Sequence, residues 1–527
     1  KIIISIIILL GSTSAFAQQN DKLLQTLKSE LNYSMEQLQK QPDHKPYYMS
    51  MRVEDKYTLV LKSSFGNKNG EEEGRARLFS PQIRIGSKQL DNFKYTTQGT
   101  QQYQGMSVSQ PTMLPLDDNA TDGIRAAIWK ETNSRYKYAC QVFDEAKTKV
   151  ATTAANEDKA ACFSDAPVEK YYDASIDNRF YHIDKADWLK KLNEISAAFK
   201  AEPELLGGEA SLTYQVSRVY IVNTEGTEVV QNRICGRIML STQAVAADGM
   251  SLPLNKDYLA YDLDSLPTVE KMVTDAKDMV KRVLALRNAP VADPYTGPAM
   301  LSGEASGVFF HEIFGHRLEG HRLKEGGETF KKMVGELVLP KEFQVYCDPT
   351  LRHYAGTDLN GYYKYDDEGV KARRVNNVVN GVLKSFLMSR VPLDGFPESN
   401  GHGRTSDDKD PVSRQSNLIV ETNKPYTEAQ MRQMLRAEAK KQGKEYGYYF
   451  KTVTSGYTYT GEGGSLNSFN VTPLEVYRIF ADGRPDQLVR GVDLIGTPLS
   501  MFSHISAAGK NASVFTGVCG AESGWVP

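Results

Sequence analysis

The sequence predicts an α+β fold with two domains, a mixed α/β N-terminal domain and a β-rich C-terminal domain. Up to residue 290, segments with apolar residues at helical spacing alternate with segments of β-type alternation. From residue 291 onward, short strand-like runs between Gly, Asn and Asp turns dominate, and few segments have helical spacing. We therefore expect domains at 18–290 and 291–527, preceded by a separate segment at 1–17.

The N-terminal domain is expected to combine helices with strands. Helices are predicted over 21–40, 117–146, 187–200 and 266–289, and β structure over 46–62, 75–94 and 211–240. Residues 46–62 are interpreted as a hairpin, and Asn223-Thr224-Glu225-Gly226 marks a turn between two strands. The last helix is expected to begin with Ser265 as its cap and with Pro267 in an early position.

The boundary between the domains is placed at the proline-rich run 290–298, which ends the preceding helix. Beyond it, strands are predicted over 343–348, 381–389, 416–421, 446–459, 475–480 and 487–492. Strong helical spacing recurs over 427–443. A further helix, which follows the boundary directly, holds two of the eight histidines of the chain.

The first 17 residues have the pattern of an export signal. Lys1 precedes the apolar run 2–10, and Ala15-Phe16-Ala17 has the A-x-A form of a signal-peptidase site. The apolar run is too short to span a bilayer, and no later stretch is long and apolar enough to do so. The sequence therefore predicts an exported protein, periplasmic or extracellular, with no integral membrane segment after signal removal.

Composition argues against nucleic acid as a partner. Lys and Arg number 63 against 65 Asp and Glu, and no basic stripe stands out.

The five cysteines are an odd number for an exported chain, and none forms a C-x-x-C pair. Cys140 and Cys162 flank a polar segment and are candidates for a disulfide. At least one thiol is left over.

His311, Glu312 and His316 form the motif H-E-x-x-x-H. Imidazole is a preferred zinc ligand, and a carboxylate beside a ligand can accept a proton from metal-bound water. In an α-helix these histidines would lie roughly 140° apart, because each residue turns about 100°. Both reach one ion only if the helix widens by a π-type turn or ends near His316. Gly315 permits either departure.

A catalytic zinc site usually has three protein ligands. Cys519, between glycines in Gly517-Val518-Cys519-Gly520, is the preferred third candidate, and His321 is an alternative. Glu319 is placed to hold an imidazole N–H. The acidic run 366–368 is interpreted as a solvated turn in preference to a ligand set. The competing interpretation of the motif is two ordinary helical histidines on different faces.

The segment from Ser306 to Gly320 resembles the TldD/PmbA (TldD/TldE) family of metallopeptidases, on its TldD-like, motif-bearing side. The family pattern is close to a small residue, then Gly-x-x-x-His-Glu-x-x-Gly-His-x-x-Glu-Gly. Further resemblance lies at 365–369, 380–383, 411–417 and 517–520. The motif resemblance covers the chain from Val291 onward, whereas residues 18–290 match only in architecture.

The resemblance implies one zinc per chain, held by His311, His316 and Cys519, with Glu312 as general acid/base. It also implies action on unfolded or flexible peptides, and a homodimer or a heterodimer with a homologous subunit. The ending Cys519–Trp525 departs from the family, which usually has a lysine and a Gly-Gln pair there.

The predicted function is a zinc-dependent peptidase in which metal-bound water is the nucleophile. Strands after Gly381 and Ser416 are candidates for an edge that binds an extended peptide. The main alternative is a catalytically silent binding or assembly subunit with a structural zinc site, partner of a homologous peptidase. Another is a hydrolase with Cys519 as nucleophile, which thiol alkylators would block and chelators would not.

Overall fold

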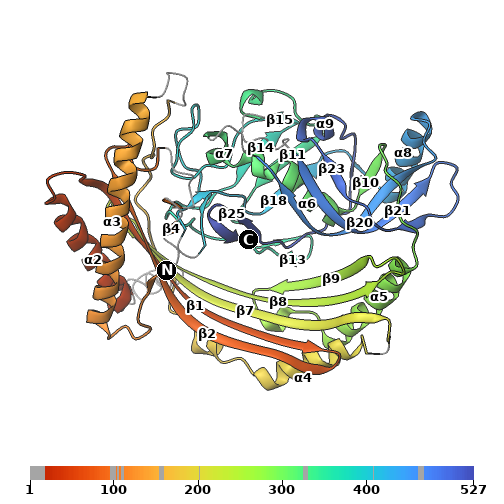
Figure 1. The fold of residues 1–527 in the computed structure, drawn as a ribbon, viewed down its shortest axis with the longest axis horizontal. Coiled ribbons are helices and arrows are strands. Elements are labelled where there is room, and N and C mark those ends of the chain that lie inside the picture. Colours follow the sequence, from red (N-terminus) through yellow and green to blue (C-terminus); the bar gives the residue numbers. More distant parts are fainter. Residues whose placement is uncertain are drawn as a thin grey trace, which may run out of the picture.

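The computed structural model describes residues 18–94, 102–103, 106–107, 112–152, 159–200, 202–324, 330–406, 409–460 and 468–527. The predicted export signal lies outside these residues. Within them, no helix is long and apolar enough to cross a bilayer. The α+β class is confirmed, because a large antiparallel sheet with flanking helices precedes a region of smaller sheets around short helices (Figure 1).

A curved seven-stranded sheet forms the N-terminal half, in the order β5-β2-β1-β7-β8-β6 with β9 beside β8. Its long antiparallel strands are β1 (Pro46–Ser64), β2 (Asn67–Ile85), β7 (Leu205–Asn223), β8 (Glu228–Val245) and β9 (Ser251–Ala260), and its short ones are β5 (Thr112–Met113) and β6 (Lys170–Tyr172). The hairpin predicted within 46–62 is wrong. This segment is one strand, and the turn lies at Phe65 and Gly66, both with positive φ.

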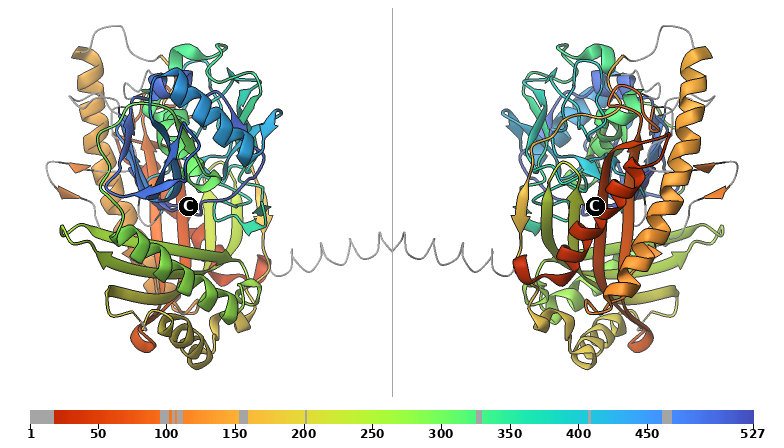
Figure 2. Two further views of the ribbon diagram at one scale, coloured as in Figure 1. Left: turned by 90° about the vertical axis from the view of Figure 1, so that its right-hand side faces the viewer. Right: turned by 90° about the vertical axis from the view of Figure 1, so that its left-hand side faces the viewer.

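Four helices cover one face of this sheet, at its two ends. They are α2 (Lys22–Gln39), α3 (Thr121–Thr152), α4 (Lys185–Ala197) and α5 (Val269–Arg287). Helices α2 and α3 lie side by side, and their core includes Met49 and Val53 of β1 (Figure 2). Helices α4 and α5 share a core with Leu59 and Leu61 of the same strand. All four of these residues are odd-numbered, and successive side chains of a strand point to opposite faces of the sheet. The even-numbered side chains of β1 therefore face the C-terminal half.

The cap predicted for the last of these helices is wrong. Thr268, not Ser265, is the N-cap of α5, because its side chain accepts from the Lys271 N–H. Ser265 ends a preceding 3₁₀ turn, η2 (Leu263–Ser265). Pro267 stands just before the cap. Its fixed φ suits the extended entry to a helix as well as the first turn, so the sequence does not distinguish the two placements.

The C-terminal half is built around α6 (Gly303–Ile313), which packs against β20 (Tyr446–Thr458) and β21 (Phe469–Phe480). One sheet runs β10-β20-β21-β22 with β23 beside β21, and another runs β15-β14-β11-β18. Their other strands are β10 (Ala299–Leu301), β11 (Phe343–Cys347), β14 (Val375–Val379), β15 (Val382–Leu383), β18 (Leu418–Thr422), β22 (Gln487–Val489) and β23 (Leu494–Gly496). Helix α8 (Glu428–Lys441) flanks the first sheet.

The hydrophobic cores divide along the chain. The two large N-terminal clusters draw their buried residues from 23–286, and the large C-terminal cluster draws its own from 305–502. A small cluster joins the halves through Tyr365 and three residues of β7 and β8. The domain limit at residue 291 itself stays a prediction.

All five cysteines are free in the structure, so the suggested disulfide between Cys140 and Cys162 is wrong. The Cys162 thiol is buried and donates to the Gln89 carbonyl at 3.3 Å. Burial raises the pKa of Cys162 to about 11, which keeps this thiol protonated and inert.

The interpretation of 366–368 as a solvated turn is also wrong, since all three side chains are buried where the two halves meet. Asp366 accepts backbone N–H groups, including that of Gly403 at 2.9 Å. Asp367 accepts from Arg52 of β1 at 3.2 Å. Burial would raise the pKa of Asp367, but Arg52 and its neighbours hold it below its usual range. Asp367 therefore joins the two halves of the molecule, whereas Asp366 orders the backbone of the C-terminal half.

Glu368 leads to a pH-dependent prediction. One carboxylate oxygen accepts the Arg390 N–H at 2.6 Å, the other has no hydrogen-bond partner among the described residues, and burial raises the pKa of Glu368 to about 7. A carboxyl with a raised folded-state pKa lowers stability as pH rises from about 4.5 to 7. Glu368→Gln should therefore stabilise the fold more at pH 8 than at pH 5, by an excess of the order of 2 kcal/mol. Urea unfolding of both proteins at the two pH values measures the change in the free energy of unfolding. An equal change at pH 5 and pH 8 would contradict the prediction.

Candidate metal centre

The α-helix that carries the H-E-x-x-x-H motif ends between the two histidines, which allows both imidazoles to face the same point. Helix α6, capped by Ser302, ends at Ile313, and the 3₁₀ turn η3 (Gly315–Leu318) carries His316. This is the second of the two expected solutions. The Gln415 amide packs against Gly315, since a Cβ there would lie 1.9 Å from the Gln415 side-chain oxygen and would displace that side chain.

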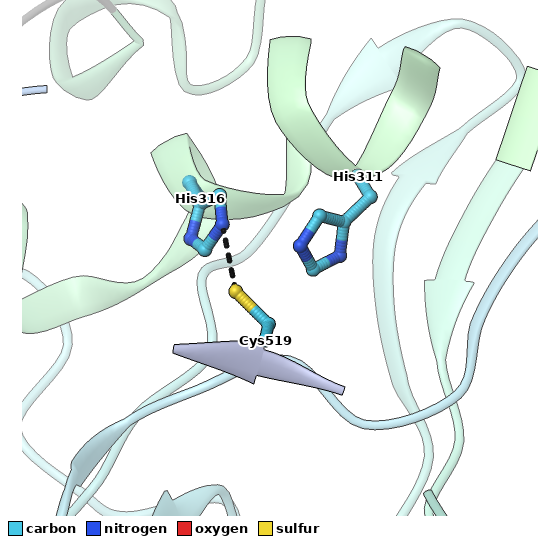
Figure 3. A group of neighbouring side chains, drawn as sticks. All are labelled: His311, His316 and Cys519. Atoms are coloured by element: carbon cyan, nitrogen blue, oxygen red, sulfur yellow. Dashed lines mark hydrogen bonds between the residues drawn. The ribbon is translucent and has the colours of Figure 1, made fainter. Parts of the chain in front are cut away.

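His311, His316 and Cys519 meet at this turn (Figure 3). Their candidate ligand atoms all lie within 4.8 Å of one another, and His316 Nε2 is 3.3 Å from Cys519 Sγ. The thiol points from β25 (Cys519–Ala521) toward the two imidazoles. No other group of three such ligands occurs among the described residues. His321 therefore lies outside the cluster, with its Nε2 3.5 Å from a Glu522 oxygen.

The three donors suit a zinc ion. Tetrahedral coordination with Zn–N near 2.05 Å and Zn–S near 2.3 Å separates nitrogen and sulfur ligands by about 3.5 Å. Burial lowers the pKa of both histidines, that of His311 to about 3, so both imidazoles are neutral and able to bind metal. Burial raises the pKa of Cys519 to about 11, so metal binding would have to displace the thiol proton. Two imidazoles and a thiolate favour zinc over hard cations.

Glu312 lies between the two histidines. Its carboxylate oxygens are 3.9 Å from His311 Nε2 and 3.8 Å from His316 Nε2. Burial, with the nearby Glu319 charge, raises the pKa of Glu312 to about 8. Gly456 of β20 makes room for this side chain, because a Cβ there would lie 2.6 Å from the Glu312 Cγ. The sequence analysis did not identify Gly456, which no local motif marks.

Glu319 makes the contact predicted for it. One of its oxygens lies 3.0 Å from His316 Nδ1, and the side chain is fully buried. If Nδ1 carries the hydrogen, Nε2 has its lone pair free on the side that faces Cys519. The contact also fixes the plane of the imidazole ring.

A cavity of about 2890 Å³ reaches the site from between the two halves. Its floor includes Lys56, Gln215 and Arg237 of the N-terminal sheet, and α6 and β20 also line it. The motif histidines and Glu312 lie on its wall. A molecule much larger than water can therefore reach the cluster.

The family model of the PmbA/TldA metallopeptidase C-terminal domain matches residues 294–523, which contain His311, Glu312, His316 and Cys519. Over these residues the chain is similar to the TldD/PmbA family of metallopeptidases. Similar curated proteins include a metalloprotease of Methanocaldococcus jannaschii, 28% identical over 49% of this chain and 52% of its own length. Another is a zinc metalloprotease TldD homolog of Saccharolobus solfataricus, 26% identical over 44% of this chain and 47% of its own. This chain thus spans about half the length of these TldD/PmbA relatives.

The likeness to solved structures extends over nearly the whole chain. TldE from Thermococcus kodakarensis superimposes with a TM-score of 0.62 at 14% identity, over 92% of this chain and 94% of its own. A protein of Thermotoga maritima described as a putative modulator of a DNA gyrase superimposes with a TM-score of 0.61 at 14% identity, over 93% of this chain and 96% of its own. At this identity the likeness shows the fold alone. It includes the N-terminal half, where no sequence motif was found.

Proposed function

We propose that this chain is a zinc-dependent peptidase that hydrolyses peptide bonds in unfolded or flexible peptides. The observation that carries the proposal is Glu312, which lies between His311 and His316 of the His311, His316 and Cys519 cluster, on the wall of a large cavity. Bound zinc would act as a Lewis acid that acidifies a coordinated water and polarises the scissile carbonyl.

Glu312 is proposed as the general acid/base. With a dication held by the three ligands, its carboxylate form is favoured, which opposes the raised pKa of the metal-free site. Its oxygens can then accept the proton of the attacking water and pass it to the leaving amine nitrogen. Gly456 leaves the space that this side chain occupies.

An extended peptide is the substrate shape that the cavity supports. Strand β18, after Ser416, is an edge strand and lines the cavity. Strand β20 also lines it, and beyond Phe450 its side opposite β21 has no paired strand among the described residues. Either edge can bind a peptide through its backbone. The other edge suggested from sequence, after Gly381, does not border the cavity.

The alternative of a silent subunit with a structural zinc lacks support from the site. Structural zinc sites usually have four protein ligands, whereas three are grouped here within the described residues. Three protein ligands would leave a bound zinc ion able to take a water beside the buried Glu312 carboxylate, as catalytic zinc sites do. We further propose that the protein is exported and acts as a homodimer or with a homologous subunit, as the family resemblance and the sequence of residues 1–17 suggest.

Removal of the metal tests the function. Protein loaded with one zinc equivalent should cleave an unstructured peptide mixture, and 1,10-phenanthroline should reduce cleavage to background. Added zinc should restore it, whereas a thiol alkylator applied to the zinc-loaded protein should have little effect, because the thiolate is coordinated. Mass spectrometry of the fragments provides the measurement. Cleavage that survives zinc removal and is stopped by the alkylator would instead support the cysteine-nucleophile mechanism.

A further inference from the structure

The third proposed ligand depends on a segment that lacks a sheet of its own. Cys519 follows His316 by 203 residues and lies in a hairpin of β25 and β26 (Gly524–Val526), which pairs with no other strand among the described residues. An isolated two-stranded hairpin is marginally stable in water. Side-chain contacts must therefore hold Cys519 against the histidines.

The first such contact is an ion pair between Arg322 and Glu522. Two guanidinium nitrogens donate to the two Glu522 oxygens at 2.7 and 2.8 Å, which is the bidentate geometry. Arg322 Nε donates to Glu319 at 2.6 Å, on the same oxygen that contacts His316. One guanidinium thus links the hairpin to the residue that orients a histidine.

Arg414 makes the second contact. It is almost fully buried and donates to the Cys519 carbonyl at 2.9 Å and to the Gly524 carbonyl at 3.2 Å, one from each strand of the hairpin. Its Nε lies 3.4 Å from the other oxygen of Glu319. Each oxygen of Glu319 therefore meets a guanidinium that holds the hairpin, and one of them also meets His316.

We infer that Arg322, Arg414 and Glu522 are positioning residues that hold Cys519 in place for the metal. The two arginines act through their shared contact with Glu319, and Glu522 acts through its ion pair with Arg322. The inference rests on the proposed metal site and adds the means by which the third ligand is delivered. An ordered hairpin presents its thiol without the entropic cost of ordering it on metal binding. Glu522 belongs to the Cys519–Trp525 ending, the part of the chain that departs from the family pattern.

Glu522→Gln tests the inference, because Arg322 keeps Glu319 as a partner and its charge is not left isolated. Zinc affinity, measured by competition with a chromogenic chelator, should fall about 10- to 100-fold, as is usual for groups that orient a metal ligand. With cobalt(II) in place of zinc, the thiolate-to-cobalt absorption band should weaken while the metal remains on the histidines. Arg322→Lys, which keeps the charge and loses the bidentate geometry, should give an intermediate affinity.

Asp248→Asn is the matched control. Asp248 forms an ion pair with Arg490, 242 residues away, so this pair also joins distant segments, and neither residue is near the cluster. The control should change neither affinity nor the cobalt band, even if it lowers thermal stability. Wild-type affinity and band in Glu522→Gln would overturn the inference. A wild type that binds no zinc, or His311→Ala that binds it equally well, would overturn the metal site instead.

Discussion

Glu312→Gln should bind zinc as the wild type does and should hydrolyse peptides about 10²- to 10⁴-fold more slowly, the usual range for loss of general acid/base catalysis. The amide has nearly the shape of the carboxylate and fits the space beside Gly456. It cannot accept the proton of the attacking water. Initial cleavage rates for one unstructured peptide, together with zinc content, measure both parts of the expectation.

Glu304→Gln provides the control for Glu312→Gln. Glu304 lies in the first turn of the same helix, and burial raises the pKa of its carboxyl too. It is not within the cluster of His311, His316 and Cys519. This variant should cleave within a few-fold of the wild type. If Glu312→Gln hydrolysed peptides as fast as Glu304→Gln, Glu312 would have no role in proton transfer.

The parts of the site that could be predicted are those encoded locally. His311, Glu312 and His316 lie within six positions, and the neighbouring Gly315 indicated that the α-helix could end there. The N-terminal helices followed from local spacing, with errors of several residues at the ends of α3 and α5. The long strand β1 did not, because its segment was predicted as a hairpin. Cys519 required a different signal, its flanking glycines together with the family resemblance, because nothing in the spacing links it to residues 203 positions earlier.

The parts that could not be predicted depend on contacts between distant segments. Residues 366–368 have the composition of an exposed turn. The burial of Asp367 is tolerable because Arg52, 315 positions earlier, and Arg233 pair with its carboxylate. Gly456 and Glu522 likewise have no local signature. Their roles arise because β20 passes beside Glu312 and because Arg322 reaches the C-terminal hairpin. Pairings of this kind are properties of the fold.

Cys519→Ala should lower zinc affinity by more than about 100-fold, because a lost ligand costs more than a lost contact to a ligand. Because the variant would then hold little metal, peptide cleavage at limiting zinc should also be lost. The fold should remain, since Arg414 holds the hairpin through the Cys519 carbonyl, which alanine retains. Zinc competition, far-ultraviolet circular dichroism and cleavage rates measure the three effects.

Cys235→Ala separates the loss of a ligand from the loss of any thiol at the cavity. Cys235 is also free, half-buried and on the cavity wall, but its sulfur lies 3.7 Å from Asn360 and away from the histidines. Zinc affinity and cleavage should both be unchanged in this variant. If Cys519→Ala bound zinc as tightly as Cys235→Ala, the third ligand would have to be another group. If it lost cleavage while keeping zinc, the thiol would act in the chemistry rather than in holding the metal.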